Sequence, residues 1–487
     1  MLDLPFEASY ARELEGLYLP WKGAAVPAPA ILRLNHDLAR DLGLDPAALA
    51  TPEGAALLSG SQTAASSQPL AQAYAGHQFG GFSPQLGDGR ALLLGEIIDT
   101  AGQRRDIHLK GSGRTPFSRG GDGKAALGPV LREYLMGEAM HALGIPTTRA
   151  LAALTTGEEI AREQLQPGAI LVRVAASHIR VGTFQFFAAR GETERLRRLA
   201  DYTIRRHFPE LAGRDDRYLG LLDGVIERQA ALVARWLAVG FVHGVMNTDN
   251  MTVSGETIDY GPCAFMERHD PQTVFSSIDT RGRYAYGNQP GILQWNLARF
   301  AETLLPLINP DDDEAAVRLA TGVIHSIPAR YKAHWLGQMR GKLGLDAEDA
   351  GDPALIDELL GLMATHAVDF TSAFRHLAAA LRGDEAPARQ LFGHAPAFAA
   401  WFARYRLRLG PQPESAASAM DRVNPLYIPR NHLVEEALAV AVGQSDMARF
   451  DALLALVSQP FVAQAGMQAY EAPAPATAAP YVTFCGT

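Results

Sequence analysis

The chain has 487 residues, 47% of them hydrophobic and 20% charged, and its formal net charge at pH 7 is −9. This is the composition of a globular protein with enough chain for roughly two to four domain-sized units. The acidic balance disfavours a nucleic-acid-binding surface, and no apolar run reaches the roughly 18 residues that suggest a membrane span. The first residues lack the basic and apolar parts of a signal peptide. With two cysteines, Cys263 and Cys485, a disulfide scaffold is not expected, so we predict a cytoplasmic protein.

The first stretch with chemical interest is glycine-rich. Residues 85–90 lead into an apolar strand predicted over 91–98, and alternation predicts a second strand over 106–110 that ends at Lys110. Glycines let backbone N–H groups approach an anion closely, because no Cβ intervenes. Such turns are more often only tight turns, and a lysine at a strand end is more often only solvated.

Residues 111–124 combine five glycines with Arg114, Arg119 and Lys124. They contain little that could form a core. The segment is therefore either a disordered loop or a loop shaped to wrap a polyanion, and its basic residues favour the second alternative.

Apolar residues at helical spacing predict a helix that ends near Leu143. This helix has two glutamates, Glu133 and Glu138, and a helix glutamate is usually just solvated. One buried beside a strand lysine would hold that lysine in position for phosphate. Glu133 is the better candidate, because it lies nearer the glycine-rich segment.

Residues 147–190 are predicted to be β-rich, with strands over 169–174 and 179–187. Arg173 and Arg180 interrupt otherwise apolar runs. A buried guanidinium needs an anionic partner, which could be a ligand or a carboxylate of the protein itself.

From residue 201 the pattern becomes helical, and one long helix ending before Gly240 leads into the run HGVMNTDNMTVSGETID over 243–259. The segments 251–253 and 256–258 flank Ser254-Gly255 and predict a short hairpin. A hairpin would bring Asn250 close to Asp259. These hard oxygen ligands suit Mg²⁺ that carries phosphate, although a polar loop without a ligand fits the same run.

Residues 260–290 are irregular and predict a surface loop. Beyond them the pattern is mostly helical up to residue 460, and residues 472–476 read as a semi-extended linker. The predicted helices span 293–308, 315–345, 353–381, 396–409 and 433–457.

The order of these parts resembles that of a protein kinase: glycine turn, strand lysine, helix glutamate, β-rich middle, long helix, polar loop and a final Asp-Tyr-Gly. Lys110, Glu133, Asn250 and Asp259 match four kinase positions. Counting five residues back from Asn250, the position of the kinase catalytic aspartate holds Val245. A valine cannot accept a proton, so by ordinary kinase rules the chain is a pseudokinase.

Longer stretches resemble the selenoprotein O (SelO) family closely, and the resemblance covers nearly the whole chain. These stretches are YAGHQFGGFSPQLGDGRA, LKGSGRTPFSRGGDGKAALGPVLREYLMGEAMHALGIPTTRAL, RVAASHIRVGTFQFF, HGVMNTDNM, IDYGPCAFM and NPLYIPRN. The resemblance implies an adenylyltransferase that transfers AMP from ATP to Ser, Thr or Tyr hydroxyls of proteins, with ATP bound in the reverse direction to a kinase. It also implies Mg²⁺, with Mn²⁺ as an alternative.

Carried onto matching positions, the resemblance assigns Asp249 as the proton acceptor and Asn250 and Asp259 as metal ligands. It pairs Lys110 with Glu133. The other residues that it places at the nucleotide are Gly87, Gly89, Arg90, Asp122, Gly123, Arg173 and Arg180. It also suggests a disulfide between Cys263 and Cys485, against two unrelated thiols. A phosphotransferase that uses Asp249 and a non-catalytic ATP-binding scaffold remain alternatives.

The expected fold is α+β: a kinase-like bilobal protein with a β-rich N-lobe, a helical C-lobe and additional C-terminal helices. We expect a monomer without nucleic-acid or membrane partners. The predicted parts are an N-terminal extension (1–70), the nucleotide-binding lobe (71–190), the catalytic lobe (191–310), a helical region (311–471) and a tail (472–487).

Overall fold

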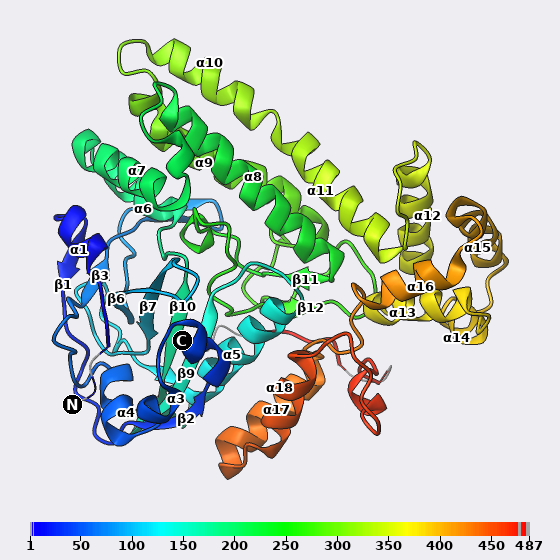
Figure 1. Ribbon diagram of the computed structural model, residues 1–487, viewed down its shortest axis with the longest axis horizontal. Helices are drawn as coiled ribbons and strands as arrows, with labels where there is room; N and C mark the ends of the chain where they lie inside the picture. The colour runs from blue at the N-terminus through cyan, green and yellow to red at the C-terminus, as the bar shows by residue number, and fades with distance from the viewer. Residues whose placement is uncertain (1, 3, 476–478, 484–487) are drawn as a thin grey trace.

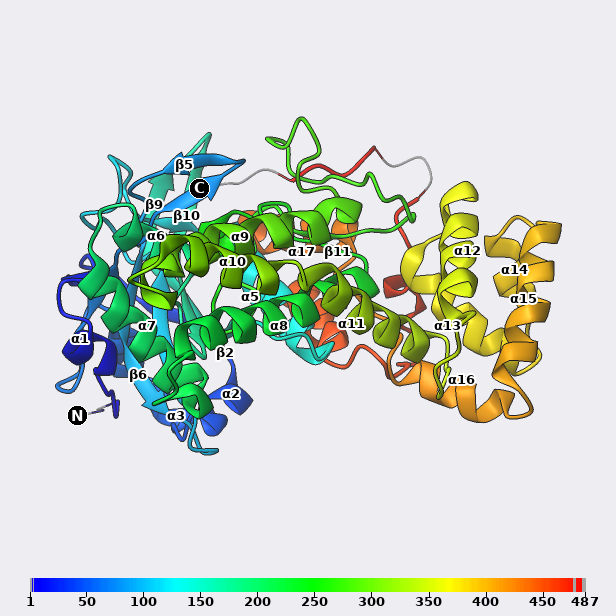
Figure 2. The ribbon, with the colours of Figure 1, turned by 90° about the horizontal axis from the view of Figure 1, so that it is seen from above.

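In the computed structural model, the chain is a mixed α+β protein with a large antiparallel sheet in its N-terminal part and a largely helical C-terminal half (Figure 1). The structure describes residues 2, 4–475 and 479–483. Figure 2 shows that the sheet and the helices between residues 352 and 421 lie at opposite ends of the long axis. Within the described residues, no helix is long and apolar enough to span a bilayer.

The sheet has the strand order β1-β3-β6-β7-β10-β9-β2, with β8 beside β10, and every pairing is antiparallel. The predicted strands at 91–98 and 106–110 are confirmed as β6 and β7, and the one at 169–174 lies within β10. The strands are β1 (Tyr18–Pro20), β2 (Ala30–Leu34), β3 (Leu70–Gln72), β6 (Ala91–Ile98), β7 (Arg104–Lys110), β8 (Ala125–Ala126), β9 (Arg149–Ala161) and β10 (Leu165–Ala175). Outside it, β4 (Gly76–Gln78) pairs with β5 (Gly81–Ser83), and β11 (Phe241–Val242) with β12 (Ala264–Phe265).

The two faces of the sheet hold different side chains, because successive residues of a strand point to opposite faces. In β7, Ile107 and Leu109 belong to a core shared with the short N-terminal helices. His108 and Lys110 therefore point to the opposite face. Arg173 of β10 is the cross-strand partner of His108, which places it on this second face as well. The second face is the one that the candidate site uses.

Helix α5 packs on this second face, against β9 and β10. It confirms the helix predicted to end near Leu143, and its own outer side is covered by α17 and α18. The bounds of these helices are α5 (Leu127–Ala142), α17 (Asn431–Gln444) and α18 (Ala448–Val457), and those of the N-terminal helices are α1 (Ser9–Glu13), α2 (His36–Asp41), α3 (Pro46–Leu49) and α4 (Pro52–Leu58).

The predicted strand over 179–187 is wrong, because the segment forms helix α6 (Val181–Ala188). Thr183 accepts a hydrogen bond from the backbone N–H of Arg180 at 3.0 Å, which starts the helix. Val181, Phe184 and Phe187 recur every three residues and are fully buried. A short apolar run has no periodicity that separates a buried strand from a buried helix, and the tertiary packing decided it.

The helical run begins earlier than predicted, with α7 (Thr193–His207), and the long helix is α8 (Arg217–Ala238). The hairpin predicted over 251–258 is also wrong. The turn at Ser254-Gly255 is present, with Gly255 at φ +80°, but its two arms pair elsewhere. Thr252 bridges to Arg180 and Thr257 bridges to Thr147. The two arms therefore pair with different segments of the N-terminal half instead of with each other.

Each predicted C-terminal helix is present, but three of them are each broken in two, and α14 and α16 form where the sequence predicts no helix. Pro328 is the second residue of the second helix of the first pair, and Ala367 and Ser445 adopt φ values of +50° and +55° at the other two breaks. The helices are α9 (Gln289–Ile308), α10 (Asp313–Ile324), α11 (Ile327–Lys342), α12 (Asp352–Thr365), α13 (Phe370–Leu381), α14 (Ala386–Leu391), α15 (Pro396–Leu409) and α16 (Pro413–Asp421).

Candidate functional site

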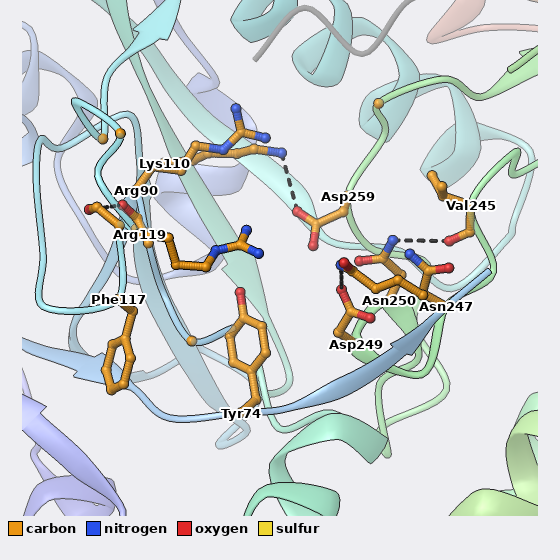
Figure 3. A pocket seen from close by; sticks show the side chains of 18 of the residues that line it. Tyr74, Arg90, Lys110, Phe117, Arg119, Val245, Asn247, Asp249, Asn250 and Asp259 are labelled. Atoms are coloured by element: carbon orange, nitrogen blue, oxygen red, sulfur yellow. Dashed lines mark hydrogen bonds and ion pairs between the residues drawn. The ribbon is translucent and has the colours of Figure 1, made fainter. Parts of the chain in front are cut away.

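A pocket of ≈ 690 Å³ opens between the second face of the sheet and the polar loop that follows α8 (Figure 3). Seven basic side chains and three carboxylates line it, which is an excess of positive charge that suits a polyphosphate. Of the twelve residues predicted for the site, Glu133 lies behind this pocket. The other eleven line it: Gly87, Gly89, Arg90, Lys110, Asp122, Gly123, Arg173, Arg180, Asp249, Asn250 and Asp259.

Asp259 is the electrostatic centre of the pocket. Its carboxylate accepts from Lys110 at 3.2 Å, from Arg173 at 2.7 Å and from Arg180 at 2.5 Å. Burial alone would raise the pKa of Asp259, but Arg180, Lys110 and Arg173 together hold that pKa well below its usual range. Asp259 also has a φ of +62°, which is uncommon for a residue with a side chain and is typical of strained functional positions. The site therefore maintains one ionised carboxylate among three cations.

Lys110 pairs with Glu133, as expected, at 2.5 Å. Glu133 is 5% exposed on α5, and it also lies 3.4 Å from Arg173. The other candidate, Glu138, instead accepts two hydrogen bonds from Arg149, at 2.8 and 2.6 Å. The choice of Glu133 over Glu138 as the lysine's partner is therefore confirmed.

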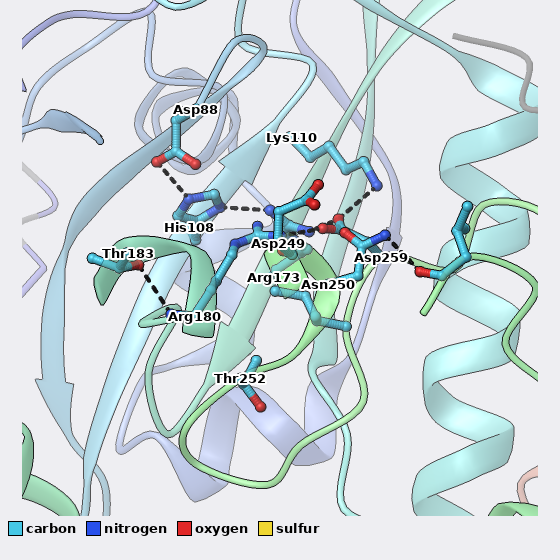
Figure 4. Close-up of polar contacts among 12 residues, drawn as sticks. Asp88, His108, Lys110, Arg173, Arg180, Thr183, Asp249, Asn250, Thr252 and Asp259 are labelled. Carbon is cyan, nitrogen blue, oxygen red and sulfur yellow. Dashed lines mark hydrogen bonds and ion pairs between the residues drawn. The ribbon is translucent and has the colours of Figure 1, made fainter. Parts of the chain in front are cut away.

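Arg173 is oriented from behind by a buried chain of polar groups (Figure 4). Its Nη2 donates to His108 Nδ1 at 2.9 Å, and His108 Nε2 lies 3.2 Å from Asp88 Oδ2. Because arginine can only donate, His108 must accept at Nδ1 and donate from Nε2 to Asp88. This series of hydrogen bonds connects Asp88, in the glycine turn, with Asp259 on the other side of Arg173.

Asp249 lies in the 3-10 turn η2 (Thr248–Asn250) beneath strand β4. It is 6% exposed, Gln78 donates to its Oδ2 at 3.0 Å, and Oδ1 has no hydrogen-bond partner among the described residues. Burial raises the pKa of Asp249 to about 6, and the hydrogen bond from Gln78 and the charge of Arg180 limit the rise. A Cβ atom on Gly76 would lie 2.4 Å from Oδ1, so only glycine allows this close approach. The carboxylate is thus poised as a proton acceptor near neutral pH.

Asn250 is oriented by its own amide group. Its Nδ2 donates to the carbonyl of Val245 at 2.9 Å, so Oδ1 remains as the acceptor. An amide oxygen and the ionised Asp259 fit Mg²⁺, which usually takes one or two protein oxygens together with substrate phosphates and water. Among the described residues, no three His, Cys, Asp or Glu side chains have the arrangement of an all-protein metal site.

The glycine-rich loop over 111–124 folds back on itself rather than extending from the sheet. Ser112 bridges to Lys124, and the N–H of Gly113 donates to the carbonyl of Gly123 at 3.0 Å. A Cβ atom added to Gly123 would lie 2.1 Å from the backbone carbonyl oxygen of Gly113. Asp122 pairs with Arg162 at 2.8 Å. The loop therefore presents Arg119 and Lys124 to the pocket from a closed turn.

Several pocket residues have no clear signal in the sequence. Tyr74 lies under the guanidinium of Arg180, with 4.7 Å between its ring centre and Cζ. At the pocket wall, the backbone N–H of Phe79 donates a hydrogen bond to Asn247 Oδ1 at 3.2 Å. These residues lie far apart in the chain, and only the folding of β4 over η2 brings them together. His108 had a usable signal, because it alternates with Asp106 and Lys110 in one strand.

The C-terminal tail lies near Cys263. The Thr483 hydroxyl donates to the carbonyl of Pro262 at 2.9 Å. Cys263 is fully buried, and burial raises the pKa of its thiol to about 11. Cys485, the other cysteine of the suggested disulfide, lies outside the described residues.

Comparison with known proteins identifies the family. A model described as protein adenylyltransferase SelO matches residues 1–458. The chain is 61% identical over 484 residues to a protein nucleotidyltransferase YdiU of Cereibacter sphaeroides, with 99% of each chain covered. It is 59% identical to the YdiU protein of Chromobacterium violaceum over 96% of this chain and 99% of the relative, and 56% identical to that of a Mycobacterium species over the full length of both. The chain therefore belongs to the SelO family of protein adenylyltransferases and is a nucleotidyltransferase enzyme.

Proposed function

We propose that the chain transfers AMP from ATP to Ser, Thr or Tyr hydroxyls of protein substrates and releases pyrophosphate. ATP binds in the reverse direction to a kinase, within a kinase-like pair of lobes formed by residues 71–190 and 191–310. The observation that supports this most directly is that Asp249, which has a raised pKa and an Oδ1 atom without a hydrogen-bond partner among the described residues, lies beside the cationic pocket around Asp259. Val245 stands where a kinase has its own base, so the proton acceptor must come from another position.

The chemical step is a substitution at the α-phosphorus. The substrate hydroxyl oxygen forms a bond to that phosphorus, and the bond from phosphorus to the oxygen bridging to the β-phosphate breaks. Asp249 takes the hydroxyl proton, and the pyrophosphate departs with the electron pair of the broken bond. General-base catalysis of this kind contributes about 10²- to 10⁴-fold.

The basic residues of the pocket hold the departing pyrophosphate. Charge-assisted hydrogen bonds from guanidinium and ammonium groups stabilise the negative charge that develops on it. Arg173 and Arg180 are 2% exposed, so their positions are set before the substrate arrives. Mg²⁺, held by Asn250 Oδ1 and Asp259, would neutralise part of the phosphate charge.

Labelled ATP tests this function. With label at the α-phosphorus, we expect label on a protein acceptor or on the chain itself, and with label at the γ-phosphorus we expect none. Asp249→Ala should lower transfer about 10²-fold or more while ATP still raises the unfolding temperature. Asp215→Ala, at an exposed position before α8, is the matched control and should be unaffected.

The alternatives give different outcomes in the same assay. Transfer only from the γ-position would show a phosphotransferase, for which the Lys110–Glu133 pair is the motivating observation. Thermal stabilisation by ATP without transfer from either position would show a scaffold. Near-normal transfer by Asp249→Ala would remove Asp249 as the base.

A further inference from the structure

A cluster of arginines and aromatic side chains borders the pocket on the side of Asp249. We name it the arginine rim and define it by Phe82, Arg283, Trp295 and Arg299, together with Arg281, an exposed arginine two residues before Arg283 in the same loop. It comes from three separate segments: strand β5, the irregular loop before α9, and α9 itself. The chain as a whole is acidic, with a net charge of −9, so a local group of three arginines is a departure that needs a physical reason.

Stacking on Trp295 holds two of these arginines in place. The Cζ atoms of Arg283 and Arg299 lie 4.8 and 5.3 Å from the ring centre of Trp295. Arg283 also lies 5.7 Å from the ring of Tyr284. Stacking on a ring face leaves the edge of a guanidinium available to a carboxylate, and it reduces the entropy lost when the carboxylate binds.

The acids near this loop that the structure describes pair with groups other than the guanidinium groups of Arg281 and Arg283. Arg299 pairs with Glu302 at 2.6 Å. Asp279 is 5% exposed, and its carboxylate accepts from the backbone N–H groups of Arg283 and Tyr284 at 2.9 and 2.7 Å. Among the described residues, no acid lies within 4 Å of the guanidinium groups of Arg281 and Arg283. Within the described residues, these two positive charges therefore have no carboxylate partner of the protein itself.

The arginine rim is continuous with the pocket. The ring of Tyr284, over which Arg283 lies, packs at a tilt against Phe79 with 5.1 Å between the ring centres, and Phe79 lines the pocket. The Tyr284 hydroxyl donates to Asn247 Oδ1 at 2.6 Å, two residues before Asp249. On the other side, the ring of His77 lies between those of Trp295 and Phe82. Its centre is 5.3 Å from the ring centre of Trp295 and 4.9 Å from that of Phe82, and Phe82 is 41% exposed.

We infer that the arginine rim is the docking surface for the protein substrate and that it selects acidic residues next to the target hydroxyl. This inference rests on the proposed function. A carboxylate beside the hydroxyl would bind the guanidinium edges of Arg281 and Arg283, while an apolar residue of the substrate packs on Phe82. Docking there brings the hydroxyl to the pocket at Gln78 and Asp249, where the α-phosphorus of ATP lies in the proposed reaction.

Two peptides test the inference by binding and by turnover. They have the same length and a single Ser, flanked by Glu in one and by Gln in the other. Fluorescence anisotropy with labelled peptides measures binding without any reaction, and α-labelled ATP measures kcat/KM. We expect the Glu peptide to exceed the Gln peptide about tenfold in both readouts. Raised salt should reduce the difference, because the contact is electrostatic and partly exposed.

Charge reversal supplies the matched variants. Arg281→Glu with Arg283→Glu should abolish the preference for the Glu peptide and favour a Lys peptide instead, while ATP still raises the unfolding temperature. Arg422→Glu, at an exposed arginine after α16, should keep the wild-type preference. Equal binding of the Glu and Gln peptides to the wild type, or a preference that survives charge reversal, overturns the docking surface. Absence of AMP transfer with retained Glu-peptide binding overturns the proposed function alone.

Discussion

At the scale of single residues, the candidate site depends on groups that do not themselves touch the pocket. His108 is fully buried and accepts a hydrogen bond from Arg173 while it donates to Asp88. Asp88 in turn accepts a hydrogen bond from the backbone N–H of Gln72 at 3.0 Å, so this series of hydrogen bonds ends on the backbone of β3. Groups that orient a charged side chain from behind affect activity nearly as much as the side chain itself. We therefore regard His108 as a positioning residue for Arg173.

Substitution of His108 tests this role. His108→Phe removes the acceptor for Arg173, and we expect AMP transfer to fall about 10- to 100-fold. His108→Asn keeps an oxygen near the place of Nδ1 and should recover part of the loss. His178→Phe is the control, because His178 stacks on His108 at 4.1 Å but bonds to Asp106 rather than to Arg173. If the two phenylalanine variants lose transfer equally, in proportion to their stability, the role of His108 is only structural.

At the scale of elements, a buried ion pair attaches two of the C-terminal helices, α13 and α17, to each other. Arg430, at the start of α17, is 0% exposed and binds both carboxylate oxygens of Asp369, at 2.6 and 2.9 Å. Asp369 caps α13 by accepting the N–H of Ser372 at 2.8 Å. The segment NPLYIPRN, which ends with Arg430 and Asn431, thus connects two helices that lie far apart in the sequence.

Removing one member of this pair leaves the other charge buried. Arg430→Met should lower the free energy of unfolding by about 3–5 kcal/mol. Asp369→Asn keeps an oxygen for the cap and removes the charge, so the double variant should be more stable than Arg430→Met alone. Denaturant unfolding of the four proteins gives the coupling energy. Additive effects of the two substitutions would mean that the pair contributes nothing to the attachment.

At the scale of the whole molecule, stability should depend on pH through Lys342, a buried lysine in the helical half. Lys342 Nζ donates to Asn424 Oδ1 at 2.8 Å and lies 3.9 Å from the ring centre of Phe374. Burial lowers the pKa of Lys342 to about 7. Above this pKa the folded protein has released a proton that the unfolded chain still binds. The free energy of unfolding therefore rises with pH from about 7 towards the ordinary lysine pKa of about 10.4.

The comparison of Lys342→Met with the wild type isolates this effect. The methionine variant does not titrate at this position, so its stability relative to the wild type should fall by about 2 kcal/mol between pH 7 and pH 9. The lost hydrogen bond to Asn424 adds a constant that does not change with pH. Lys332→Met, at an exposed position on the same helix, should show no such trend. A difference that is constant between pH 7 and pH 9 would mean that Lys342 keeps an ordinary pKa when buried.

The sequence by itself determined the local elements and most of the residues that meet in the candidate pocket. Period-2 alternation predicted β6 and β7, helical spacing predicted α5, and the choice of Glu133 as partner of Lys110 followed from their places in these elements. Local patterns suffice there because each element buries one face and its periodicity records which one.

The tertiary structure alone decided what depends on partners distant in the chain. Val181–Ala188 became a helix because its short apolar run fits either structure, and the arms around Ser254-Gly255 paired with other segments because a turn does not specify its partners. The cross-strand pairing of His108 with Arg173 depends on strand register, which one residue of slip would reverse. The arginine rim joins three separate segments, so the cluster forms only in the folded chain.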